Sequence, residues 1–438
     1  MDDDGNRAAK RHSYKLWYVV LAIAAVFVVV LGLCFVFHTD GVEKRLAALR
    51  EAGQPTSFAE LAEYTSLPDD AENAAGAYID AFSAYVRPAD DVNLPIIRSK
   101  TELPDRGEPL PEPMAEAMSK YLQDNRKCLA LLREAGEIEY CRYQWNYATG
   151  FPPYLKETIE SVKLLKTASV FYAAKGDANV SIDFLEDGLK LGNSLIHEPM
   201  LIGYILRIAC IEISISGLER ILNATSLKDV QMRQLEKMLC QTSETLDLSK
   251  AIITERCQVI ENFTNPSQSP QTAGNAELIK TWFGKTGLID YLDYMDECIE
   301  ASKLHGTKRI TRFQEIYDKK QNLSFLHFLV KMVAPEMKHF SQRDLRVKSQ
   351  LDLAITALAV ERYRLAKGNL PQRLEQLVPQ YLTQIPTNPF NDNPIRYKQT
   401  NPGYILYSVG EDGEDDGGKE RDKKRQDEPY DLTFIVTR

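Results

Sequence analysis

Residues 167–195 read TASVFYAAKGDANVSIDFLEDGLKLGNSL, and this stretch indicates how the body of the chain folds. Gly176 and Asp177 interrupt a helical pattern, after which Ile182 and Leu185 lie on one face of a second helix. A glycine followed by a helix-capping aspartate, between two runs of helical periodicity, predicts a tight turn. The stretch therefore predicts a helical hairpin.

The hairpin resembles one unit of a tetratricopeptide (TPR)-like repeat in its Ala-x-x-Gly-Asp turn and in the leucine that follows in the second helix. A repeat array needs about three stacked copies, and no second copy recurs at a fixed period in the sequence. We therefore expect a mainly α protein with a helical domain over residues 41–340. Its helical hairpins would form either a TPR-like array or an irregular bundle.

Two segments interrupt the helical periodicity of this domain. Prolines recur throughout residues 87–113, and because proline lacks a backbone donor and breaks helices, we predict an extended connector there. Residues 265–275, NPSQSPQTAGN, are rich in turn formers and predict a polar loop.

Residues 200–222, MLIGYILRIACIEISISGLERIL, are apolar on almost every side. Such a run fits either a membrane span or the central helix of a bundle. Arg207, Glu212 and Glu219 interrupt it, and a charge in mid-membrane is costly. We therefore expect the central helix, in which Arg207 and Glu212 need polar partners.

Residues 16–37, LWYVVLAIAAVFVVVLGLCFVF, are 22 residues without a charge. At about 1.5 Å per residue the run can cross a hydrocarbon core of about 30 Å. The alternative is a cleaved signal peptide, but its apolar region is usually shorter and ends at a small-residue cleavage site, which this run lacks. We therefore predict a single-pass transmembrane anchor. Basic residues are concentrated in residues 1–15, so the positive-inside rule places this tail in the cytoplasm and the body outside it.

The composition restricts the partners of the body. Charged residues make up 26% and hydrophobic residues 44% of the chain, as in a globular protein. The net charge is −9 and no long basic stripe occurs, which argues against nucleic acid as a partner. Outside the apolar run, the cysteines show no C-x-x-C spacing, so no zinc or thioredoxin-like motif is indicated. They are expected to be buried thiols, with one or two disulfides as the alternative in an oxidising compartment.

From about residue 345 the pattern changes. Leu351, Ala354, Ile355 and Leu358 mark the apolar stripe of an amphipathic helix that ends at Gly368. A short helix and proline-rich turns follow, and then three strand-like runs, PIRYKQ, GYILYSVG and YDLTFIVT. We therefore predict an α+β domain over residues 345–438 with a small antiparallel sheet.

Residues 357–418 resemble the C-terminal domain of the major pseudopilin of type II secretion systems. That family combines a long helix with a Tyr-Arg…Gly…Pro ending, a proline-rich turn, and a Tyr-x-Leu-Tyr-Ser-x-Gly-x-Asp-Gly segment. The matching positions are Tyr363, Arg364, Gly368, Pro371, Pro386, Pro389, Phe390, Pro394, Tyr397, Tyr404, Leu406, Ser408, Gly410, Asp412, Gly413, Gly417 and Gly418. The resemblance covers about a fifth of the chain.

The chain departs from the family at its other end. Pseudopilins begin with a leader whose cleavage exposes a phenylalanine-led helix with a glutamate at its fifth position, and residues 16–37 have no such pattern. The resemblance therefore implies a C-terminal fold but not assembly into a filament. The arrangement of the whole chain is also similar to envelope proteins of planctomycete-type bacteria, which implies a location in the bacterial inner membrane.

The pseudopilin resemblance also implies a calcium site in the acidic loop near the C-terminus. The positions that match the family's ligand region are Leu406, Ser408 and Asp412, and nearby carboxylates are Asp415, Asp416, Asp427 and Asp431. Calcium takes six to eight hard oxygen ligands, which such a loop can supply. The alternative is a solvated loop whose acids are neutralised by the bases that follow, which are Lys419, Arg421, Lys423, Lys424 and Arg425.

No catalytic motif stands out in the sequence. It contains no H-E-x-x-H, G-x-S-x-G, Walker loop or G-x-G-x-x-G. His197 and Glu198 lie in a predicted turn between helices, where a structural role is expected. Residues 140–154, YCRYQWNYATGFPPY, are rich in aromatic side chains, which fit either a packed core or a groove for a sugar-like ligand.

These observations favour a non-catalytic, membrane-anchored envelope scaffold or adaptor that binds other envelope proteins. One alternative is a component of a type II secretion or type IV pilus-like machine, because of the C-terminal resemblance. Another is a hydrolase or carbohydrate-binding protein, because of the aromatic segment.

Overall fold

The computed structural model describes residues 41–88, 93–95, 101–147, 152–265, 276–323, 330–331, 334–422 and 428–438, with the backbone alone between residues 276 and 286. The predicted anchor, the cytoplasmic tail and residues 266–275 of the polar loop lie outside the described residues.

The predicted helical hairpin is confirmed. Helices α6 (Leu155–Ala174) and α7 (Ala178–Asn193) pack against each other. Between them Gly176 adopts a φ of 79°, a left-handed conformation that costs glycine little. The side chain of Asp177 accepts a hydrogen bond from the backbone N–H of Val180 at 3.2 Å and caps α7.

The apolar run at residues 200–222 forms α8 (Leu201–Ala224), which contacts α6, α7, α10, α14 and β3. Among the described helices it alone is long and apolar enough to cross a membrane, and 67% of its most apolar window is buried within the protein. Its charges have partners. Arg207 donates to the Thr245 carbonyl at 2.7 Å and to Asn193 Oδ1 at 3.0 Å, and Glu212 pairs with Arg343 at 3.2 Å.

Most other elements of the body are helical as well. Residues 41–51 form the first described helix. Between α3 and α4 the described part of the proline-rich connector contains no helix or strand. The further helices are α2 (Phe58–Tyr64), α3 (Ala75–Ser83), α4 (Glu112–Asp124), α5 (Arg126–Gly136), α9 (Asp229–Glu244), α10 (Leu248–Thr264), α11 (Ala276–Ser302) and α12 (Gly306–Gln321).

The long helix α14 (Met337–Lys367) links this body to the C-terminal sheet. It contacts α8, α9 and α12 on the body side and β2 and β3 on the other side. It ends at Gly368, which has a φ of 78° and forms the left-handed C-cap that the sequence predicts. Apolar residues are buried along both of its halves, from Met337 and Leu345 to Leu358 and Val360.

The three predicted strands form one antiparallel sheet in the order β1-β2-β3. A short 3₁₀ helix, η4, precedes them. In the central strand, Leu406 lies opposite Tyr397 on one side and Phe434 on the other. The elements are η4 (Leu374–Leu377), β1 (Arg396–Gln399), β2 (Tyr404–Ser408) and β3 (Leu432–Val436).

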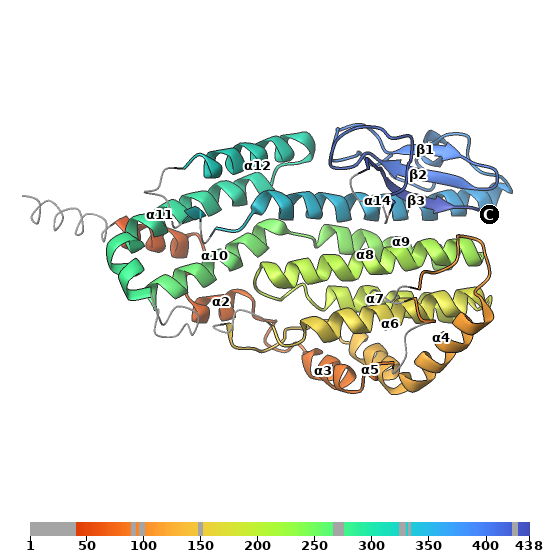
Figure 1. Ribbon diagram of the computed structural model, residues 1–438, viewed down its shortest axis with the longest axis horizontal. Helices are drawn as coiled ribbons and strands as arrows, with labels where there is room; N and C mark the ends of the chain where they lie inside the picture. The colour runs from red at the N-terminus through yellow and green to blue at the C-terminus, as the bar shows by residue number, and fades with distance from the viewer. Residues whose placement is uncertain are drawn as a thin grey trace, which may run out of the picture.

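One hydrophobic core joins the helical body to the sheet. It contains Leu46 of the first described helix, Ile211 of α8, Leu351 of α14 and Phe434 of β3. Figure 1 shows the sheet lying along α14 at one end of an elongated molecule. The change of sequence pattern near residue 345 is therefore not a break in the core, and the C-terminal module is packed onto the body.

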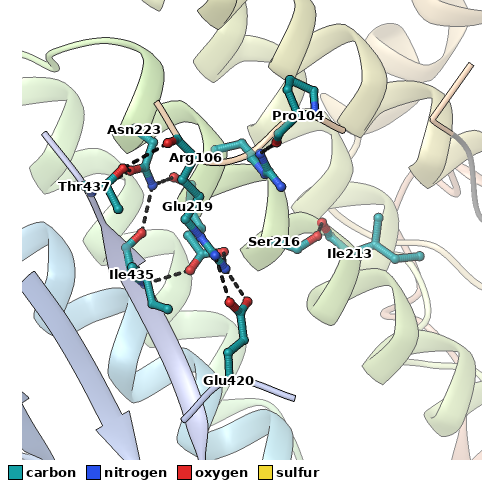
Figure 2. A network of polar contacts seen from close by, with 10 residues as sticks. Pro104, Arg106, Ile213, Ser216, Glu219, Asn223, Glu420, Ile435 and Thr437 are labelled. Atoms are coloured by element: carbon teal, nitrogen blue, oxygen red, sulfur yellow. Dashed lines mark hydrogen bonds and ion pairs between the residues drawn. The ribbon is translucent and has the colours of Figure 1, made fainter. Parts of the chain in front are cut away.

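A polar network fastens β3 to α8 (Figure 2). Glu219 accepts a hydrogen bond from the backbone N–H of Ile435 at 2.7 Å and pairs with Arg106 at 3.1 Å. Arg106 comes from the proline-rich connector and also pairs with Glu420 of the C-terminal loop. Asn223 adds a second bond, because its Oδ1 accepts from the backbone N–H of Thr437 at 2.7 Å. The connector, α8 and the last strand are thus held together.

We predict that Arg106→Ala lowers the free energy of unfolding of the whole chain. Glu219 would then be a buried carboxylate without its cation, which costs about 3 kcal/mol. We take the lower end of the range for broken buried ion pairs because Arg106 keeps partial contact with water. Urea unfolding followed by circular dichroism measures the loss. Lys120→Ala, which breaks an exposed pair with Asp124, is the matched control and should cost less than about 1 kcal/mol. Equal losses in the two variants would contradict the role of the network.

Candidate functional site

A cleft of about 640 Å³ lies where α9, the start of α12, α14 and the loop before β1 meet. This volume is in the range of small-molecule and cofactor sites. The loop is the proline-rich turn that carries part of the pseudopilin resemblance. The cleft is lined by Glu236 of α9, by Leu304 and Arg309 before and within the first turns of α12, by Lys348 and Asp352 of α14, and by Pro389 of the loop.

The loop wall of the cleft is tied to α12. The Asp392 carboxylate accepts hydrogen bonds from the backbone N–H of Thr307 at 3.2 and 3.3 Å and from the Thr307 hydroxyl. A carboxylate at the first turn of a helix also interacts favourably with the helix dipole. These contacts hold the loop across the cleft from α14.

Three charged residues of α14 follow one another at intervals of four: Asp344, Lys348 and Asp352. Residues at this spacing lie on one face of a helix. Asp344 is fully buried and pairs with Arg309 at 2.8 Å and with Lys348 at 3.2 Å, and it accepts a hydrogen bond from the Tyr204 hydroxyl. Its charge is therefore neutralised by cations of α12 and α14, and α8 adds a hydrogen bond.

Asp352 is in a different situation. Its carboxylate lines the cleft and accepts no hydrogen bond from any residue in the described part of the chain. Burial raises its pKa to about 7, against the opposing effect of Lys348. On the same cleft, Nη2 of Arg309 is buried and has no acceptor among the described residues. The cleft thus presents one carboxylate with unused bonding capacity, whereas Nη2 of Arg309 has no exposed surface on the cleft.

Other reactive side chains of the cleft are paired or protonated. Glu236, a further carboxylate of the wall besides Asp352 and Asp392, pairs with Arg362 at 2.6 Å. Burial raises the pKa of the Cys240 thiol in the same wall, and a protonated thiol is a poor nucleophile. The cysteines of the described residues are all free.

The aromatic segment predicted at residues 140–154 is largely a packed core. Tyr143 and Tyr154 are buried with ring centroids 4.0 Å apart. Trp145 packs edge-on against Tyr147 with centroids 5.0 Å apart. Of the two interpretations that the sequence allows, the described part of the segment fits the packed core.

The Glu198 carboxylate is the hydrogen-bond acceptor that three residues of this segment share. It accepts hydrogen bonds from the Tyr143 backbone N–H at 3.0 Å, from Trp145 Nε1 at 3.3 Å and from the Tyr154 hydroxyl. Burial raises its pKa to about 7, although these three donors favour the ionised form. His197 beside it has its pKa lowered by burial and by nearby cations, of which Lys250 contributes most.

The C-terminal acidic loop brings some of the predicted calcium ligands together. Asp415 and Asp416 lie close enough to Asp431 to raise its pKa further, although burial is the larger cause. Leu406 and Ser408 lie in β2 and are buried. The remaining carboxylate, Asp427, lies outside the described residues.

Hydrogen bonds and ion pairs use several of these carboxylates. Asp412 Oδ1 accepts from the backbone N–H of Glu414 at 3.2 Å, and Asp415 pairs with Arg396. Asp431 Oδ2 accepts from the backbone N–H of Gly418 at 2.7 Å.

Two carboxylate oxygens in this loop, Asp416 Oδ2 and Asp431 Oδ1, are buried without a hydrogen-bond partner among the described residues. Orphaned oxygens of this kind fit a cation. Within the same residues, no group of three or more His, Cys, Asp or Glu side chains has the geometry of a metal site. A calcium ion here would therefore depend on backbone oxygens for most of its ligands.

Sequence reasoning missed the cleft. Asp352 falls within the run of residues that predicts a buried helix stripe, and Arg309 lies in a helix that carries no motif. The available signal was the Asp-Lys-Asp spacing at residues 344, 348 and 352. Its importance could not be recognised without knowing that α12 packs against that face.

Comparison of the chain with known protein families, with curated proteins and with solved structures finds no match.

We predict that the stability of the fold falls as pH rises from about 4.5 to 7 through the ionisation of Glu198. Its pKa is about 7 in the folded chain, above the 4.5 of an ordinary glutamate, so the fold favours the protonated form and loses this contribution as the pH passes 7. Glu198→Gln mimics the protonated form. The difference between its melting temperature and that of the wild type should therefore increase in favour of the variant from pH 5 to pH 8. Asp124→Asn, at an exposed carboxylate, should show no such gain. A difference between Glu198→Gln and wild type that does not change with pH would contradict this prediction.

Proposed function

We propose that this protein is a membrane-anchored adaptor of the bacterial envelope that binds another polypeptide in the cleft between its helical body and its C-terminal module. The observation that carries the proposal is the position of α14, which is covered by α8, α9 and α12 as well as by the sheet.

The coverage of α14 favours an adaptor over a filament subunit. In the pseudopilins that the C-terminal segment resembles, the long helix that enters the globular head also packs the subunits together. The first half of α14 here is occupied by the body, and Asp344, Leu345 and Val347 are buried there. The part of α14 that is buried in the core is therefore not available to neighbouring subunits.

The start of the body supports the anchored arrangement. The predicted span ends at residue 37, and the chain is helical from residue 41, the first residue that the structure describes. That helix is part of the core through Val42, Leu46 and Leu49, and Arg45 pairs with Asp293 of α11 at 3.2 Å. With so short a link, the body would lie directly against the outer surface of the membrane.

Site-specific photocrosslinking in cells tests the adaptor proposal. Leu304 is 39% exposed and lines the cleft, so p-benzoylphenylalanine at this position should form an adduct with another polypeptide in the membrane fraction. The matched control is Ile79 of α3, which is 47% exposed and away from the cleft, and it should form none. A variant without residues 1–40 should leave the membrane fraction.

Two outcomes would contradict the proposal. The first is that Leu304 forms no adduct under conditions in which the photoprobe is active. The second is an adduct ladder made only of this chain, which would favour the filament-like alternative.

A second candidate function is calcium binding by the acidic loop, and the orphaned oxygens of Asp416 and Asp431 favour it. These two carboxylates would hold the ion together with backbone oxygens of the loop. When bound, calcium would supply positive charge that relieves repulsion among the crowded carboxylates. The loop would then be held against the end of the sheet.

We predict that calcium raises the melting temperature of the full-length chain. At about ten times its dissociation constant, calcium would add about 1.4 kcal/mol to the free energy of unfolding. Asp431→Asn keeps an acceptor for the Gly418 N–H but loses the charge, so it should abolish the rise. Asp124→Asn should keep it. If the wild type shows no rise at about 1 mM calcium, the range of extracellular sites, the calcium proposal fails.

A further inference from the structure

We propose that a second cavity binds the carboxylate group of a small organic molecule, with Lys250 as its direct ligand and Arg207 as a buried counter-charge. The cavity has a volume of about 260 Å³ and shares no lining residue with the cleft. It lies between the turn after α7, the first half of α8, the end of α9 and the start of α10. The inference goes beyond the adaptor function and does not depend on it.

The first support is the environment of Arg207, which lines the cavity. Four arginines are buried among the described residues. Three of them form ion pairs with carboxylates, namely Arg256 with Asp296, Arg309 with Asp344, and Arg362 with Glu236. Arg207 instead donates to neutral carbonyl, hydroxyl and amide oxygens of Asn193, Thr242 and Thr245. A buried charge without a counter-charge costs free energy, and an anion in the cavity would supply that counter-charge.

Arg207 remains a cation at neutral pH. Burial lowers its pKa to about 10, against the opposing effects of Tyr204 and Asp344. Asp344 is itself neutralised by Arg309 and Lys348. Because Arg207 is 2% exposed, it acts on the cavity through its charge and not as a hydrogen-bond donor to the ligand. Such a charge acts strongly in an interior that holds little water.

The second support is Lys250, in the first turn of α10. It lines the cavity and is partly exposed. Its ammonium group lies 6.0 Å from the centre of the Tyr64 ring, and it forms no ion pair with any carboxylate in the described part of the chain. An ammonium group has three donors, and its hydrogen bonds to a carboxylate are among the strong ones. Lys250 is therefore free to contact a ligand carboxylate.

The third support is the positive charge around the turn after α7, which forms one wall of the cavity. His197 lies in this turn, and its pKa is lowered by burial and then by Lys250, Arg142 and Arg207. Arg142 has no carboxylate partner within the described residues either, because its side-chain hydrogen bonds go to two hydroxyl groups. Three cations that lack carboxylate partners thus act on one wall.

Acidic side chains of the cavity oppose an anion only in part. Glu198 has three donors of its own, and with a pKa of about 7 it carries less than a full charge at neutral pH. Asp247 Oδ1 accepts from the backbone N–H of Lys250 at 3.3 Å and caps α10. Glu244 and Asp247 are exposed, so water and salt screen their charges more than the buried charge of Arg207.

The size of the cavity restricts the ligand to a small molecule. Its volume of about 260 Å³ is near the lower end for ligand pockets, which is roughly 300 Å³. Leu195, Ile196 and Ala251 line its apolar part. A carboxylate on a short aliphatic skeleton therefore matches both the charges and the apolar surface.

Saturation-transfer NMR titrations of the full-length chain in detergent test the inference with three probes of one skeleton. Isocaproate carries the carboxylate, isocaproamide replaces it with a neutral group of nearly the same shape, and leucine adds an α-ammonium group. Isocaproate should bind at least about tenfold more tightly than isocaproamide, the value of one charged hydrogen bond. No binding of isocaproate at about 10 mM, or equal binding of the amide, would overturn the inference.

Variants of Lys250 assign the binding to this cavity. Lys250→Met keeps the aliphatic stem without the charge, and it should fold because Lys250 is partly exposed. It should lose the preference for isocaproate, whereas Lys250→Arg restores a cation and should keep it. The matched control is Lys120→Met, at an exposed lysine of α4, which should also keep it. An unchanged preference in Lys250→Met, or a lost preference in Lys120→Met, would show that the carboxylate does not bind at Lys250.

The leucine titration identifies the source of the carboxylate. Tighter binding of leucine than of isocaproate would support the site and assign it to an amino acid, whose ammonium group pairs with Glu244 at the exposed side. Weaker binding of leucine would support the site for a simple carboxylic acid.

Discussion

The buried carboxylate of Asp344 constrains how α14 sits in the molecule. It bonds to Tyr204 of α8, Arg309 of α12 and Lys348 of α14 itself. An unpaired charge at this depth would cost several kcal/mol, so α14 cannot slide or rotate without breaking the set. The apolar core around it is shared with the sheet. Position and rotation of α14 therefore determine where the C-terminal module lies relative to the helical body.

The cleft follows from this fixed position. Because Asp344 faces α12, the residue two turns later, Asp352, faces the gap between α12, α9 and the proline-rich loop. Asp392 holds that loop to the start of α12. The site is thus assembled from four separate segments, none of which carries a recognisable binding motif. Packing alone places the Asp352 carboxylate in the cleft, where it accepts no hydrogen bond from the described residues.

The C-terminal segment has the predicted fold, but its contacts with the helical body could not be predicted from its own sequence pattern. The helix, the left-handed cap at Gly368 and the three antiparallel strands are as expected from the pattern of residues 345–438. The network of Arg106, Glu219 and Asn223, which joins β3 to α8 and to the proline-rich connector, is outside that pattern. A module that shares its core and its polar contacts with a helical body is a fixed part of that body.

The sequence by itself determined the local elements: the α6–α7 hairpin through Gly176 and Asp177, the buried α8 through its all-round apolarity, and the three strands through short strand-like runs that follow proline-rich turns. Each depends on periodicity and turn chemistry within a short stretch of chain. Only the tertiary structure decided that Glu198 gathers the aromatic segment and that Asp352 opens onto a cleft. Burial and the loss or gain of partners depend on residues up to hundreds of positions away, and these set the pKa and the bonding capacity of a side chain.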